Sequence, residues 1–424
     1  MAAVESPSPQ PGLFEPPPAV PPAPAARPTS PPRVRTPNRA QATWRPVDLE
    51  GLRPEDHPAR VGWAYVDRLD LARLYREIEA VEGAAGRPAT DPKLLLALWL
   101  YATLEGVGGA RALDRLCDQH LAYRCLCGGV PVNYHTLADF RTAHGDVLDD
   151  LLTCSVATLL AEGLVELNRV AQDSVRVRAS AGAASFRRRP SLERCRAAAE
   201  AQVRALRAEL DADPAATSRR QQKARERTDR VAKALAQLSV LEAKKKPAEK
   251  PEARVSTTDP ETRVMKMSDG GFRPASNLQF ATDTASQVIV GVDVTNVGSD
   301  AGQLAPMVEQ LEERHAQPPA AMLVDGGFAK TEAIEQVSPH TTVYAPVQKP
   351  KDPSRDPHVP RPGASPAVAA WRQRMGTPGA QAIYKERAAT AECVSAQARN
   401  RGLRRLLVRG LPKVRAIAVW YAIA

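Results

Sequence analysis

The sequence lacks the features that mark membrane and secreted proteins. Its longest apolar run, residues 94–104, is much shorter than the roughly 20 residues that a membrane-spanning helix needs. Prolines occupy the N-terminal stretch where a signal peptide would have its apolar core. We therefore expect neither a membrane nor a secretory role.

Cysteine and aromatic residues are also scarce, and acidic residues are outnumbered by basic ones. Six cysteines in 424 residues do not make a disulfide framework, which favours a reducing compartment, and we expect a cytoplasmic protein. Aromatic residues make up only 4%, which argues against recognition of single strands through stacked bases. Asp and Glu number 48 against 58 Lys and Arg, and the formal charge of +10 favours double-stranded DNA contacted through its phosphates.

Composition and periodicity divide the chain into three parts. Residues 1–60 are rich in proline and alanine and have few large apolar side chains, which predicts a disordered tail. Residues 61–166 have a helical period and several glycine turns, which is typical of a helix-turn-helix DNA-binding domain. Residues 167–424 alternate strands with helices, which predicts an α/β domain built on a mixed sheet flanked by helices.

Helix starts in the second part can be predicted from capping residues. We expect a first helix over 65–82 and a second that begins after Asp91, with Pro92 in its first turn. A later helix is predicted to begin near Thr136, where Asp139 completes a capping box.

Two segments interrupt the α/β pattern. Residues 186–263 are rich in Ala, Arg, Lys, Gln and Glu, with apolar stripes at helical spacing and a break at 211–214, which predicts a helical hairpin. Its basic clusters are expected to be a solvated surface or a contact for DNA or a second subunit. Residues 349–379 are proline-rich and predicted to be a loop.

Two aspartates lie on predicted strands. Strands are expected over 170–177, 277–281, 287–294, 321–324 and 341–347. Asp173 lies within the first, and Asp325 follows the fourth and precedes two glycines. Ligands bind at strand ends in open α/β sheets, and carboxylate oxygens suit Mg²⁺.

Several short blocks, taken in order, resemble one family. They are 170–179, 258–266, 294–304, Leu323 to Phe328, Tyr384 to Arg387, Glu392, and 402–405. Together they resemble the DDE transposases of bacterial insertion sequences, in particular those whose ribonuclease H-like domain is split by a helical insert. The resemblance covers nearly all of the chain after residue 60.

The resemblance implies a site and a reaction. Asp173, Asp325 and Glu392 would be the catalytic residues and would hold two Mg²⁺ or Mn²⁺ ions for strand cleavage and joining. Tyr384, Arg387 and Arg399 would contact DNA in that domain, and Arg141 and His135 in the helical region. It also implies transposon ends and target DNA as partners, a homodimer on that DNA, and association with the nucleoid.

Alternatives remain open at the level of sequence. Residues 393–396 and 275–277 depart from the family pattern, so the protein could be an impaired relative that only binds DNA. A third reading is a different ribonuclease H-like nuclease. Asp283 and Asp293 compete as ligands, but neither is included in the triad. Four residues close in sequence could suggest a zinc site: Cys117, His120, Cys125 and Cys127. Their spacing lacks the paired ligands of such sites, so buried structural cysteines are favoured.

Overall fold

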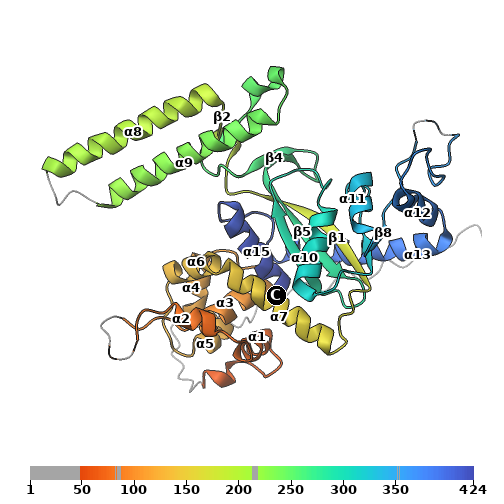
Figure 1. Cartoon of the computed structure of the whole chain (residues 1–424). Coiled ribbons are helices and arrows are strands. Elements are labelled where there is room, and N and C mark those ends of the chain that lie inside the picture. The colour runs from red at the N-terminus through yellow and green to blue at the C-terminus, as the bar shows by residue number, and fades with distance from the viewer. Residues whose placement is uncertain (1–47, 82, 84–86, 213–217, 351, 353) are drawn as a thin grey trace, which may run out of the picture. The chain divides into compact units, whose positions relative to one another are not determined.

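The computed structural model describes residues 48–81, 83, 87–212, 218–350, 352 and 354–424, which all belong to one compact unit (Figure 1). The predicted tail lies outside the described residues up to position 47, and so does most of the hairpin turn. Ordered structure begins before the expected boundary at residue 60. A short 3₁₀ turn, η1 (Glu50–Leu52), precedes helix α1 (Pro58–Asp67), which contains that boundary.

The N-terminal region is helical, as expected, and packs around one buried helix. Its helices are α1, α2 (Ala72–Arg76), α3 (Pro92–Leu104), α4 (Ala110–Gln119), α5 (Leu121–Cys127), α6 (Tyr134–Ala143) and α7 (Gly145–Ala161). In α3, 11 of 13 residues are buried, because helices α1, α5 and α6 pack against it from different sides. A helix that is surrounded by other helices must be apolar on all sides, as α3 is.

The capping predictions were partly right. The Asp91 carboxylate accepts the Lys93 N–H at 2.8 Å, so the start of α3 is confirmed. The start of α6 was predicted two residues late, because the Asn133 side chain caps it by accepting the N–H groups of His135 and Thr136 at 3.0 Å. The single helix expected over 65–82 is instead the two short helices α1 and α2.

A six-stranded mixed sheet forms the second region. Its strands are β1 (Arg169–Arg178), β4 (Arg263–Lys266), β5 (Phe272–Asp283), β6 (Ile289–Thr295), β7 (Ala321–Leu323) and β8 (Thr342–Tyr344). The order is β4-β5-β1-β7-β8, and β6 also pairs with β5. Strand β5 runs antiparallel to its neighbours, whereas β7 and β8 run parallel to β1 and to each other. All five predicted strands are confirmed; β4 was not predicted.

Helices flank this sheet. They are α10 (Leu304–His315), α11 (Thr331–Val337), α12 (Pro366–Met375), α13 (Pro378–Arg387), the π-turn η4 (Ala388–Glu392), α14 (Cys393–Asn400) and α15 (Leu411–Ile423). Helix α12 lies inside the segment 349–379 that was predicted to be a loop. It forms because Ser365 caps it and Pro366 takes its first position, where a missing N–H costs nothing.

The helical insert is a hairpin, as predicted. Helices α8 (Arg189–Ala212) and α9 (Ser218–Ala243) lie side by side in Figure 1 and pack against each other. At the hairpin base are the turns η2 (Ala183–Ser185) and η3 (Pro247–Glu252) and a small sheet of β2 (Phe186–Arg187) and β3 (Val255–Ser256). The Arg263 guanidinium donates to the Gln237 side chain at 2.7 Å and so ties α9 to the strand that follows the insert.

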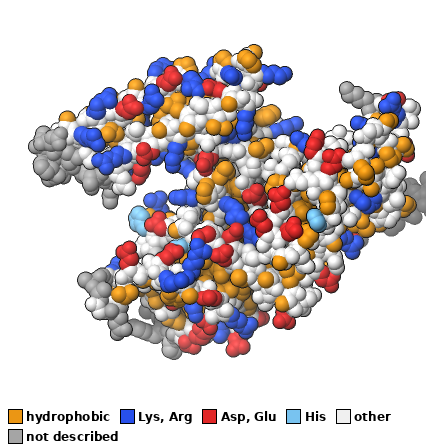
Figure 2. Space-filling view, viewed as in Figure 1, with side chains coloured by type: hydrophobic (Ala, Val, Ile, Leu, Met, Phe, Trp, Pro, Cys, Tyr) orange, Lys and Arg blue, Asp and Glu red, His pale blue; other side chains and the backbone are white. Residues whose placement is uncertain are grey.

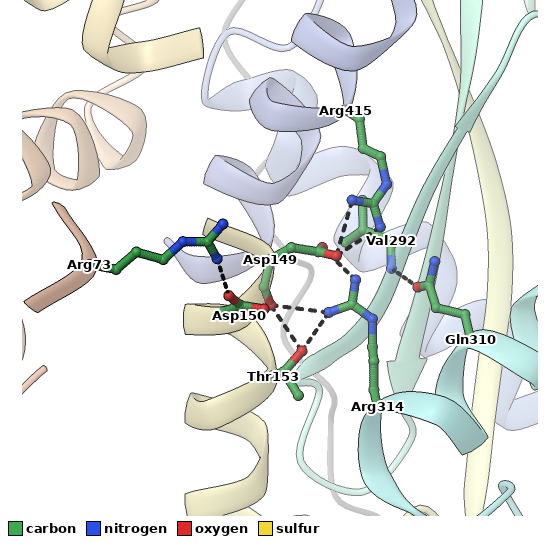
Figure 3. A network of polar contacts seen from close by, with 8 residues as sticks. All are labelled: Arg73, Asp149, Asp150, Thr153, Val292, Gln310, Arg314 and Arg415. Atoms are coloured by element: carbon green, nitrogen blue, oxygen red, sulfur yellow. Dashed lines mark hydrogen bonds and ion pairs between the residues drawn. The ribbon is translucent and has the colours of Figure 1, made fainter. Parts of the chain in front are cut away.

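A polar network joins the helical region to the sheet region (Figure 3). The Arg314 guanidinium of α10 pairs with the Asp149 carboxylate of α7 and donates to the Thr153 hydroxyl at 2.8 Å. Arg415 of α15 pairs with the same carboxylate at 3.1 Å. Gln310 of α10 accepts the backbone N–H of Val292 at 3.0 Å, which extends the network to β6.

The C-terminal helix α15 completes the joint. It packs against α3, α6 and α7 of the helical region and against β5 and β6 of the sheet. Trp420 is fully buried and its indole N–H donates to the Arg141 carbonyl at 3.0 Å. Among the residues that the structure describes, no helix is both long and apolar enough to cross a membrane.

Candidate active site

The parallel pairing of β1 and β7 brings Asp173 and Asp325 into the same part of the sheet. Ala171 is paired with Leu323 in this ladder. Asp173 lies two residues after Ala171 on β1, and Asp325 lies two residues after Leu323, the last residue of β7. Asp325 is in the turn that follows β7, where its carboxylate accepts the Gly327 N–H at 2.6 Å.

Helix α13 and the π-turn η4 cover the face of the sheet to which these aspartates belong. Side chains two residues apart on a strand share a face. Ala171 and Leu323, two residues before the aspartates, pack with Ala391 of η4 in one small buried cluster. The aspartates therefore lie just beyond an apolar contact that holds this segment against the strands.

An ion pair from α13 reaches Asp173. The Arg387 guanidinium lies 3.1 Å from the Asp173 carboxylate, and the two side chains are only 13% and 23% exposed. Burial raises the pKa of Asp173, Arg387 opposes that rise, and the nearby Asp325 and Asp300 carboxylates add to it. The half-buried Tyr384, one turn before Arg387, also has its pKa raised by burial.

Glu392 ends the π-turn η4. Its predecessor Ala391 is buried against the strands, whereas Glu392 itself is exposed. A π-turn holds one more residue than an α-turn, and such turns are frequent at functional sites. Because a π-turn closes on the fifth residue, it brings Glu392 closer to the side of the helix that carries Arg387 than an unbroken α-helix would.

Asp300 is a neighbour that the sequence reasoning missed. Its carboxylate accepts from the Asn277 and Gln279 amides at 2.8 and 3.2 Å and lies 3.6 Å from the Arg176 guanidinium. A Cβ added at Gly327 would lie 2.8 Å from Asp325 Oδ1 and 3.9 Å from Asp300 Cβ, so both side chains flank this glycine. The sequence gives no sign of this, because Asp300 lies in a loop outside any predicted strand.

The carboxylate pair fits a divalent cation in part. Two hard oxygen donors on adjacent strands are typical ligands of Mg²⁺. Burial disfavours the charged form of Asp173 and raises its pKa, which one arginine only partly offsets, so a cation beside it would stabilise the charge. Within the described ranges, however, no three His, Cys, Asp or Glu side chains lie close enough to hold an ion together. Glu392 therefore does not lie close enough to the two aspartates to hold one ion together with them.

Arg141 does not lie where a DNA contact requires it. Its side chain is 6% exposed, and the guanidinium stacks 4.3 Å from the Trp99 ring centre and donates to the Gly108 carbonyl. Burial lowers its pKa to about 10. The predicted role in DNA contact is therefore corrected: in this fold Arg141 holds α6 against α3. The sequence could not reveal this, since polar and buried positions alternate on a short helix.

His135 and Arg399, two further residues predicted to contact DNA, are accessible. His135 is exposed in the first turn of α6, and its ring lies 4.0 Å from that of Tyr134. Arg399 is exposed near the end of α14.

The two carboxylates that compete as metal ligands lie elsewhere. Asp283 is buried and accepts the N–H and hydroxyl of Ser286 in a turn, while Asp293 is half-buried on β6. Cys117 and Cys127 are both free and buried, and their thiols are hydrogen-bonded to each other.

Comparison with known proteins identifies the N-terminal helices. Residues 47–143 match the family model described as Transposase domain (DUF772), a stretch that ends with the last residue of α6. No curated protein and no solved structure matches the chain. The match supports a transposase in general, and it leaves the sheet and its carboxylates outside the matched residues.

Proposed function

We propose that this chain is a DNA transposase of the DDE type, which cuts DNA at the ends of an insertion sequence and joins them to a target. Asp173, Asp325 and Glu392 would form its site with two Mg²⁺ or Mn²⁺ ions. Its partners would be double-stranded DNA and a second copy of the chain. The transposase domain in the N-terminal helices is consistent with this proposal.

The observation that carries the proposal is the register of β1 against β7. Two residues beyond its last pair, Ala171 with Leu323, are Asp173 on β1 and Asp325 in the turn after β7, and a nearby helix supplies Arg387. The strand order supports it too: β6, β5 and β1 are antiparallel neighbours, and β7 and β8 follow in parallel. That order is the one expected of a ribonuclease H-like sheet.

The chemistry follows from these side chains. Divalent ions held by the carboxylates would activate the attacking oxygen and neutralise charge on the phosphate. Arg387 already lies at Asp173 and is placed to neutralise a DNA phosphate that approaches that carboxylate. Tyr384 lies one turn away on the same face of α13 and would position the sugar-phosphate backbone.

An alternative is a DNA-binding protein that does not cut. The observation that favours it is the exposed position of Glu392 outside the carboxylate pair. In such a protein the helical region would still recognise transposon ends, while the sheet region would be inert. Metal-dependent cleavage separates the two candidates.

Cleavage of duplex DNA tests the proposal. The substrate is a labelled duplex that carries the sequences flanking the reading frame, with Mg²⁺ or Mn²⁺. We expect strand nicking by the native protein and its loss, by at least about 100-fold, in Asp325→Asn, since a misplaced or missing ligand costs that much.

Asp293→Asn is the matched control, because it makes the same change on β6, a strand that pairs with β5 and not with β1 or β7. Cleavage should persist in this control. Binding of the duplex without nicking by the native protein would instead favour the alternative. Equal nicking by native protein and Asp325→Asn would contradict the proposed site.

A further inference from the structure

A cleft lies between the base of the hairpin and the segment that leads into α15. Its volume is about 600 Å³. Helix α9 forms one wall with Arg230, Lys233 and Gln237, and the other wall carries Arg409 and Lys413. Cations thus face each other across it.

The acidic side chains in the cleft are already engaged. Glu261 accepts the Leu411 N–H at 2.6 Å. Asp259 accepts the backbone N–H groups of Gly410 and Glu261. Gly410 has φ +87°, a left-handed conformation that favours glycine and makes the turn tight enough for these contacts. The two carboxylates therefore fix the turn that presents Arg409 and Lys413.

The cations, in contrast, have few partners. Lys233, Arg409 and Lys413 are exposed, and Arg230 has only a distant intrahelical pair with Glu226 at 3.8 Å. No acidic residue occurs after Glu392, a stretch that holds seven Lys and Arg. Figure 2 shows Lys and Arg side chains spread along the hairpin as well. The lining of the cleft therefore carries four cations against two carboxylates, which leaves a net positive charge.

We propose that this cleft binds the sugar-phosphate backbone of double-stranded DNA. The inference rests on the proposed function and adds a second DNA contact, away from the carboxylate pair. Phosphate contacts by Lys and Arg supply affinity and fix the position of a duplex without reading its sequence. The hairpin insert would thereby hold the DNA on which the carboxylates act.

The connection between the cleft and the carboxylate pair supports DNA as the occupant. The segment before the cleft pairs with the end of β1, where the Leu406 N–H donates to the Arg178 carbonyl at 2.7 Å. Asp173 lies five residues earlier on that strand, a distance of roughly 17 Å at ~3.3 Å per residue. One duplex, with a helical turn of about 34 Å, can span both places.

Salt-dependent binding tests the inference. The probe is a fluorescein-labelled duplex of mixed sequence, a few helical turns long, and anisotropy is measured without divalent metal. Two paired variants each remove two cations from one wall: Arg230→Gln with Lys233→Gln, and Arg409→Gln with Lys413→Gln. The matched control, Lys223→Gln with Arg227→Gln, removes the same charge from α9 outside the cleft.

Loss of either cleft pair should make the negative slope of log K against log salt shallower by about 2, since each phosphate contact contributes about −0.9 to it. The control should leave the slope near that of the native protein. Equal slopes for cleft and control variants would overturn the inference while leaving the cleavage result untouched. If the native protein does not nick DNA but the variants change the salt dependence as expected, the proposed function is contradicted, whereas the inference that the cleft binds DNA is supported.

Discussion

Asp173 is subject to opposing effects that bear on its proposed role. Burial raises the pKa of its carboxyl, while the Arg387 guanidinium at 3.1 Å favours the charged form. A charged group that is only partly compensated costs stability but can bind a cation strongly. The Nε atom of Arg387 is itself buried without a hydrogen-bond partner. Buried groups whose pKa values are shifted by burial and a charged partner are common at functional sites.

His315 makes stability depend on pH. It ends α10, and its Nε2 lies 3.1 Å from the Val290 carbonyl. Burial lowers its pKa in the folded protein, so the unfolded chain takes up the proton first as pH falls. The stability that neutral His315 contributes is present above the unfolded pKa of ~6.5 and is lost as pH falls from there to the lower folded pKa.

We therefore predict that His315→Gln loses less stability on acidification than the native protein. Glutamine keeps a donor for the Val290 carbonyl but does not titrate. The measurement is urea unfolding at about pH 7.5 and about pH 5.5, on either side of the unfolded pKa. His340→Gln, an exposed position, is the control and should behave like the native protein. Equal acid sensitivity of His315→Gln and the native protein would be contrary to this account.

At the scale of elements, the π-turn η4 sets the geometry of the candidate site. It joins α13, which carries Tyr384 and Arg387, to α14 and ends at Glu392. Thr390 within it accepts the Gln287 amide at 3.0 Å, and Ala391 packs on the strands. These two contacts hold the buried side of the turn against the sheet, so the extra residue affects the exposed side of the helix, where Glu392 lies.

Deletion of Ala389 should convert this π-turn to an α-turn. Ala389 is exposed, so its loss removes no packing. We expect the fold to persist and cleavage to fall by about 100-fold, because loss of the widened turn shifts Glu392 relative to Ala391 and the strands on which Ala391 packs. Circular dichroism and the nicking assay measure the two effects, with Ala389→Ser as the control. Undiminished cleavage after deletion would show that the turn does not position Glu392.

Among the strands, sequence reasoning succeeded where a single pattern decides. The strand that holds Asp173 and the strand that precedes Asp325 were predicted nearly to their ends, because the first has an alternating pattern and the second is a short apolar run that ends before two glycines. Strand β5 is longer than predicted, since its first part, Phe272 to Ser276, has a mixed pattern that pairing with β4 and β1 overrides. Helix α12 was missed because the prolines around it suggested a loop.

On the scale of the whole molecule, α15 joins regions that the sequence separates. The boundary predicted at 166 divides helices from strands, but α15, from the far end of the chain, packs on both. Its apolar residues, Val414 to Tyr421, are almost all buried between α7 and β6. Together with the Arg314–Asp149 pair, this helix should make the two regions unfold as one.

We predict that Trp420→Ala lowers the free energy of unfolding by about 3–5 kcal/mol, as expected for a fully buried tryptophan. The loss should appear in one transition for both regions, followed by circular dichroism and by tryptophan fluorescence during urea unfolding. Trp63→Ala is the control, because Trp63 is 36% exposed and should cost much less. Two separate transitions in the native protein would contradict the cooperative unit.

The sequence by itself determined the local features of this protein: the helical N-terminal region, the central strands, the hairpin insert and the aspartates on two of the strands. These depend on periodicity, capping and turn residues, which act over a few positions. Tertiary structure alone decided that Asp173 meets Asp325 and Arg387, that Arg141 is buried, and that α15 joins the regions. Such contacts link residues far apart in the chain, and only strand register and side-chain packing select them.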